Sequence, residues 1–137
     1  MRVLALDHGS ARCGVAVCDP TGTIVTPLDV VKKPDSKVGR EQLAALVAER
    51  EIELVLIGLP RLQSGEEGAQ AATVRAFAGR LAALIDAPVE FHDERFTTRM
   101  AESSRADGAT SAEDSLAAAH LLEDYLEMNR REDDDTR

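Results

Sequence analysis

The chain has 137 residues, a hydrophobic fraction of 44%, an aromatic fraction of 3% and a formal net charge of −9. These values predict one globular domain with an aliphatic core and exclude a membrane span, because no apolar run approaches the ~20 residues that a bilayer requires. Residues 1–65 hold eight basic and eight acidic side chains, whereas residues 66–137 hold eight and seventeen. A broad basic surface for nucleic acid is therefore excluded. The one dense basic patch, which is equally consistent with an ordinary solvated surface, consists of Lys32, Lys33, Lys37 and Arg40.

The first third of the chain predicts three consecutive strands at residues 2–7, 13–18 and 23–31. Their connections are short, and the second contains the turn sequence DPTG, so an antiparallel meander is expected. Cys13 and Cys18 lie five residues apart on one strand and point to opposite faces, which prevents them from pairing or sharing a metal. With no signal-peptide pattern at the N-terminus, they are interpreted as reduced thiols of a cytoplasmic protein.

The rest of the chain alternates between helix and strand. Periodicity and turn residues predict helices at residues 38–50, 66–85, 98–105 and 112–128, and strands at 53–60 and 88–91. Ser64 and Glu67 form a possible capping box for the second of these helices. The domain is expected to span residues 1–128, and the charged segment 129–137 is expected to be a disordered tail.

This element order predicts an α/β fold with a mixed five-stranded sheet, in which a three-strand antiparallel meander precedes alternating helices and strands. Helices are expected on both faces of the sheet. The ribonuclease H-like fold has this order, and the nucleotide-binding half-domain of actin and the sugar kinases shares most of it.

Three acidic residues stand at the ends of predicted elements. Asp7 ends the first strand, Glu94 follows the last strand, and Asp114 opens the last helix. The helical face that carries Asp114 is otherwise apolar and should pack on the sheet, which takes this carboxylate inward. A buried carboxylate needs a partner, and bound divalent cations would satisfy all three acids together.

Each of these residues also has a structural interpretation. Asp7 is a good turn-forming residue, and Asp114 fits a capping box with Ser111. Glu94 has arginines nearby in the sequence with which it could form an ion pair. His92 is best interpreted as a histidine with a structural partner at the end of a strand. Taken singly, each acid is more often structural than catalytic, so the functional interpretation depends on the fold bringing the three together.

Four motifs cover most of the chain in a fixed order: LALDHGSARCGVAVCDP (4–20), VLIGLPRLQSGEEG (55–68), HDERFTT (92–98) and EDSLAAAHLLEDYL (113–126). With these motifs the sequence resembles the YqgF family of ribonuclease H-like nucleases, whose members are named as pre-16S rRNA nucleases or Holliday junction resolvases. The resemblance implies that Asp7, Glu94 and Asp114 are the metal-binding catalytic residues. The chain departs from the family at His8, where an apolar residue is usual, and before Asp114, where lysine and arginine are usually frequent. Related resolvases carry their second acid at the end of the fourth strand, where this chain has Gly58.

The expected activity is hydrolysis of phosphodiester bonds with two Mg²⁺ or Mn²⁺ ions held by the three acids. Arg12, Arg61 and Arg95 lie in loops at the predicted edge of the site and are candidates for holding phosphates, although each could be an ordinary surface arginine. Pre-16S rRNA is favoured as substrate over a four-way DNA junction, because no evident dimer interface supports paired cuts. The expected partners are nucleic acid and the assembling small ribosomal subunit, with no membrane. Whether the chain is a monomer or a weak dimer is left open.

Two other functional classes share features with this sequence. An actin-like or sugar-kinase ATPase would place its first phosphate loop at residues 7–14, but it needs two such domains and the chain has room for one. A nucleic-acid-binding assembly factor without catalysis would keep the fold and lose metal binding, and the presence of all three acids argues against it.

Overall fold

The computed structural model describes residues 1–94 and 111–135, and the side chains of 1–94 and 114–132. Five strands form one sheet in the order β3-β2-β1-β4-β5. Strands β1 (Val3–His8), β2 (Arg12–Cys18) and β3 (Val25–Lys32) form the antiparallel meander that the short connections predict. Strands β4 (Leu54–Leu59) and β5 (Val89–Asp93) then add in parallel on the other side of β1.

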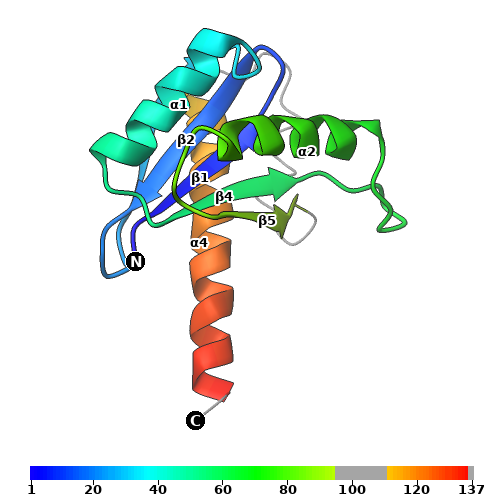
Figure 1. The fold of residues 1–137 in the computed structure, drawn as a ribbon. Coiled ribbons are helices and arrows are strands. Elements are labelled where there is room, and N and C mark those ends of the chain that lie inside the picture. Colours follow the sequence, from blue (N-terminus) through cyan, green and yellow to red (C-terminus); the bar gives the residue numbers. More distant parts are fainter. Residues whose placement is uncertain (95–110, 136–137) are drawn as a thin grey trace.

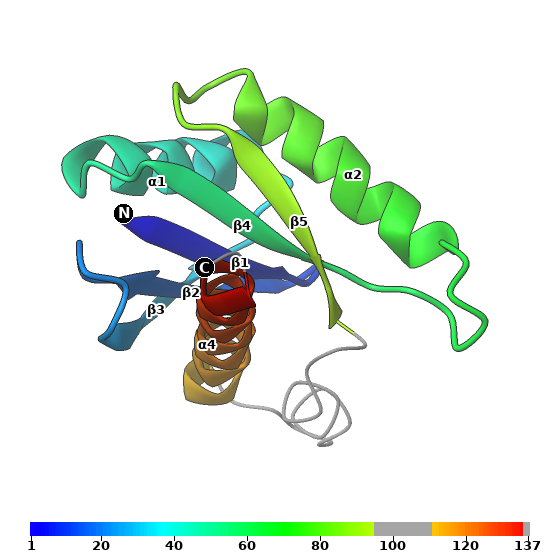
Figure 2. The same ribbon diagram turned by 90° about the horizontal axis from the view of Figure 1, so that it is seen from below.

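The helices lie on both faces of this sheet (Figure 1, Figure 2). Helices α1 (Lys37–Glu49) and α2 (Ala69–Ala82) cover one face, where Phe77 and Leu43 belong to the larger core cluster. Helix α4 (Ser111–Asp135) covers the other face, where Leu121 and Leu122 pack on Val3 and Leu56. The α/β class, the mixed five-stranded sheet and the helices on both faces are therefore confirmed. No helix of the described residues is both long enough and apolar enough to cross a membrane.

Two expectations about helix ends differ from the structure. Ser64 and Glu67 form no capping box, because the Ser64 hydroxyl accepts from the amide of Glu66 and the helix begins later, after Gly68. Helix α4 runs past residue 128 to Asp135, where a disordered tail is expected from residue 129 on. An ion pair between Arg131 and Glu127, four residues apart, supports this extension. The helix predicted at 98–105 lies outside the described residues.

The first turn of α4 lies directly on strand β2. A Cβ atom added at Gly14 would lie 2.0 Å from the carbonyl oxygen of Asp114, so only glycine allows this approach. Ser115 fixes the same contact, because its hydroxyl donates to the carbonyl of Leu28 at 2.5 Å and accepts from the amide of Val15 at 3.4 Å. Asp114 therefore has a position set by main-chain packing as well as by the apolar face of its helix.

We expect Gly14→Ala to lower the free energy of unfolding by about 3 kcal/mol, because two main-chain segments must separate to admit the methyl group. Urea denaturation monitored by circular dichroism measures this loss. Gly79→Ala is the matched control, since a Cβ at Gly79 in α2 would meet no atom within 4 Å. An equal stability for Gly14→Ala and the wild type would contradict the close packing of α4 on β2.

Candidate active site

The site lies at one end of the sheet, where strands β1, β4 and β5 end and strand β2 begins. Asp7 is the next-to-last residue of β1 and pairs with Gly14 of β2. Side chains alternate along a strand, so Asp7 shares its face with Val3 and Ala5, which pack under α4. The carboxylate of Asp7 therefore projects toward the first turn of α4, which carries Asp114.

Glu94 reaches the same place from the end of β5. A Cβ added at Gly58 of β4 would lie 2.7 Å from the Glu94 carboxylate oxygen Oε1 and 3.2 Å from its Cγ. The side chain of Glu94 therefore occupies the space that any larger residue at position 58 would fill. A hydrogen bond joins the carboxyl groups of Asp7 and Glu94.

Two carboxyl groups in contact cannot both ionise easily. Burial, followed by the charge of Glu94 and the hydrogen bond to it, raises the pKa of Asp7 to about 8, and the charge of Asp114 adds to the effect. The pKa of Glu94 is also raised, chiefly by burial and further by the charge of Asp93, although the hydrogen bond with Asp7 acts to lower it. At neutral pH the two groups share a proton, as in other carboxyl pairs held at short range. A bound cation would replace that proton with a stronger source of positive charge.

Asp114 has a different partner. Its carboxylate pairs with the guanidinium of Arg12, the first residue of β2. Its charge acts on Asp7, so the three acids share one electrostatic environment. Among the described residues, no three His, Cys, Asp or Glu side chains are arranged to hold one ion. The donor set nevertheless suits a hard divalent cation, because Asp7 and Glu94 offer carboxylate oxygens at a place where their negative charges oppose each other.

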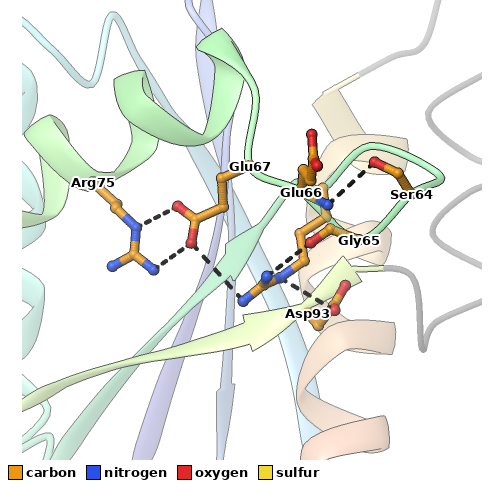
Figure 3. A network of polar contacts seen from close by, with 7 residues as sticks. Ser64, Gly65, Glu66, Glu67, Arg75 and Asp93 are labelled. Carbon is orange, nitrogen blue, oxygen red and sulfur yellow. Dashed lines mark hydrogen bonds and ion pairs between the residues drawn. The ribbon is translucent and has the colours of Figure 1, made fainter.

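Arg61 contacts Gly65, Glu67 and Asp93, three residues near the ends of neighbouring elements that Figure 3 shows close together. Its guanidinium donates to the carbonyl of Gly65 at 3.0 Å and forms ion pairs with Asp93 at 3.3 Å and Glu67 at 3.9 Å. Glu67 in turn accepts two hydrogen bonds from Arg75. The position of Arg61 thus favours holding Asp93, the neighbour of Glu94, over holding a phosphate. Arg95, the third arginine expected at the site, lies outside the described residues.

Two histidine pairs border the site. His92 is buried and contacts Asp124 of α4, with 2.7 Å between Nε2 and Oδ2, in agreement with its structural interpretation. His8 points to the opposite face from Asp7, where its Nε2 lies 3.0 Å from Oδ2 of Asp35 and its ring lies against Phe77. Sequence reasoning missed the pair of His8 with Asp35, and the only available signal was the polar residue at the end of an apolar strand.

Comparison with known proteins shows to which family the chain belongs. Residues 1–128 match the model of the family RuvX, described as Holliday junction resolvase. The chain belongs to the RuvX family. A relative from Streptomyces avermitilis is 43% identical over 136 residues, covering 94% of this chain and 87% of the relative. Another, from Chloroflexus aggregans, is 40% identical over 134 residues, covering 93% and 94%. Both carry the name "Putative pre-16S rRNA nuclease".

Solved structures agree with the fold of this RuvX-family chain. Thermus thermophilus RuvC in complex with a Holliday junction substrate superposes with a TM-score of 0.56 at 16% sequence identity, covering 94% of this chain and 96% of RuvC. The fowlpox virus Holliday junction resolvase superposes with a TM-score of 0.53 at 13% identity, covering 94% and 99%. The ribonuclease H-like architecture expected from the element order is thereby confirmed.

Proposed function

We propose that this chain is a divalent-metal-dependent endonuclease that hydrolyses phosphodiester bonds. Asp7, Glu94 and Asp114 are its proposed metal ligands and catalytic residues. The observation that carries the proposal is the contact between the Asp7 and Glu94 carboxyl groups, at an edge of the sheet where both pKa values are raised. A fold maintained only for stability would gain nothing from two opposed carboxylates at this place.

Mg²⁺ or Mn²⁺, with two ions expected, would supply Lewis acidity for the activation of water and for the charge on the leaving oxygen. Asp7 and Glu94 would give up their shared proton when such an ion binds. Asp114 would have to leave Arg12 to become a third ligand. The Arg12 guanidinium would then donate to a substrate phosphate in place of the carboxylate, because a phosphodiester and a carboxylate each offer two anionic oxygens to its N–H groups. Arg95 is a further proposed phosphate contact, whereas the contacts of Arg61 favour a positioning role.

The favoured substrate is the 5′ region of pre-16S rRNA during assembly of the small ribosomal subunit in the cytoplasm. The names of the relatives at 40 and 43% identity support this choice. The alternative is a four-way DNA junction, supported by the description of the family model. A catalytically silent assembly factor is a second alternative, although the presence of Asp7, Glu94 and Asp114 argues against the loss of metal binding.

The deciding experiment incubates the purified protein with a 5′-extended 16S precursor, and separately with a synthetic four-way junction, in the presence of Mg²⁺ or Mn²⁺. We expect metal-dependent cutting of the RNA and little cutting of the junction. If the protein cut the four-way junction and not the RNA, the DNA junction would replace the rRNA precursor as the proposed substrate. The absence of cutting, together with no heat of Mn²⁺ binding in a calorimeter, would contradict the nuclease proposal.

A further inference from the structure

A short basic segment adjoins Arg12 and His8, each of which is next to one of the three acids in sequence or in space. We call residues 32–37 the lysine turn, because Lys32, Lys33 and Lys37 are all exposed within it. We propose that the lysine turn binds backbone phosphates of the nucleic acid that enters the site. This inference rests on the proposed nuclease function and names the surface on which the substrate strand would lie.

The register of the sheet places the lysine turn next to the site. Lys32 ends β3 and pairs with Arg12 of β2, so both side chains leave the sheet on the same face. That face is the one from which Arg12 reaches Asp114. The amide of Lys33 donates to the carbonyl of Ala11 at 2.9 Å. This bond holds Lys33, the residue after Lys32, against the loop that follows β1.

The lysine turn is held in one conformation before any ligand arrives. Asp35 is bound to His8, the residue after Asp7, and the His8 side chain is only 3% exposed. Ser36 caps α1 by accepting from the amide of Gly39 at 3.0 Å and also donates to the carbonyl of Lys33 at 2.6 Å. Lys33 itself has a φ of 49°, a left-handed conformation that the surrounding bonds maintain. A preorganised surface loses less conformational entropy on binding than a mobile loop would.

The charge of this segment opposes that of the chain. Residues 32–40 contain four basic side chains and one acidic side chain, whereas the chain carries −9. The single acid, Asp35, already contacts His8, and the Lys37 ammonium lies 4.0 Å from Glu41 in a highly exposed pair. Such a pair contributes little and opens readily. Lys32 lies on the face of Arg12 and Asp114, and Lys33 and Lys37 extend the positive charge away from that face along the turn. Such a row of ammonium groups favours a polyanion whose charge repeats along a strand.

The test compares two variants from which the same number of positive charges has been removed. One is Lys32→Gln/Lys33→Gln/Lys37→Gln. Its control is Arg50→Gln/Arg80→Gln/Arg130→Gln, which changes three exposed arginines elsewhere. Fluorescein-labelled single-stranded RNA and a labelled four-way junction are the probes, and fluorescence anisotropy gives Kd from 50 to 300 mM salt without added metal. Thermal melting verifies that both variants are folded.

We expect the lysine variant to bind RNA roughly 10- to 100-fold more weakly than the control near 0.1 M salt, with a salt slope smaller by about 2. In the cleavage assay its KM should rise while kcat stays near the wild-type value. Equal Kd and salt slope for the two variants would overturn the inference, whether or not the wild type cuts. Lysine-dependent binding without any cleavage would support the inference and contradict the nuclease function. Failure of the wild type to bind either probe would overturn both the lysine-turn inference and the proposed nuclease function.

Discussion

Asp7→Asn is expected to abolish metal-dependent cleavage, with kcat falling by at least roughly 10³-fold, as for other residues at the centre of a catalytic group. The amide keeps the size of the side chain and removes the anionic oxygen that a cation needs. Cleavage of the 5′-extended precursor under single-turnover conditions measures the loss. Retention of more than a tenth of the wild-type rate would contradict the role proposed for Asp7.

The same variant should be more stable than the wild type. Because the pKa of Asp7 is raised on folding, the folded chain holds a proton that the unfolded chain releases, and stability falls as pH rises between about 4 and 8. Asparagine removes this penalty, so the gain should grow from pH 5 to pH 8 and reach about 2 kcal/mol. Thermal melting at the two pH values, in the presence of a chelator, tests this.

Asp19→Asn is the control with the opposite sign. Asp19 is partly exposed, and hydrogen bonds from Thr21 and from the amides of Ile24 and Thr23 lower its pKa to about 2. Its contribution to stability is therefore present at neutral pH and lost in acid, so Asp19→Asn should lower the melting temperature at pH 8. A loss of stability in Asp7→Asn as well would show that Asp7 is a structural carboxylate.

Gly58→Ala is expected to lower kcat/KM for cleavage by about 10²-fold, because a displacement of a catalytic group by 1 Å can have an effect of this size. The added methyl group would lie 2.7 Å from Oε1 of Glu94, so the Glu94 carboxylate must leave its present position. The affinity for Mn²⁺, measured by calorimetry, should fall in parallel with the rate.

Gly79→Ala provides the matched control for this substitution as well. It lies in the interior of α2 with open space around it, so the same change should stabilise the fold by about 0.5–1 kcal/mol and leave cleavage unchanged. Wild-type cleavage by Gly58→Ala would show that the observed position of Glu94 is not needed for catalysis. If Gly58→Ala lost stability but kept its affinity for Mn²⁺, the observed position of Glu94 would likewise not be needed for metal binding.

The sequence predicts the elements well because their periodicity is local. The ends of β1 and β4, one residue beyond Asp7 and Gly58, follow from apolar runs that stop at polar or turn residues, and the five strands appear within a few residues of their predicted bounds. The inward face of α4 follows from Ala117, Ala118 and Leu121, which are buried as expected. Local patterns of this kind carry enough information to place each acid at the end of an element.

The side-chain partners could not be predicted in the same way. Arg12 and Asp114 are 102 residues apart, and nothing near either residue indicates that they pair. Arg61 matched the pattern of a phosphate-binding arginine, yet in the fold its donors reach Gly65 and Asp93. The capping box at Ser64 failed because Glu67 bonds to Arg75, an alternative that only the folded chain offers. Such choices depend on which groups meet in three dimensions.

The overlap of Glu94 with the space above Gly58 has an evolutionary consequence. A carboxylate delivered from the end of β5 and one attached to the end of β4 would compete for the same volume, so a sequence can hold only one of them. Residues 58 and 94 should therefore covary among ribonuclease H-like nucleases, with glycine at the first whenever an acid stands at the second. With Glu94 as the proposed second ligand, that acid would thus be able to move between neighbouring strands during divergence while the sheet itself is unchanged.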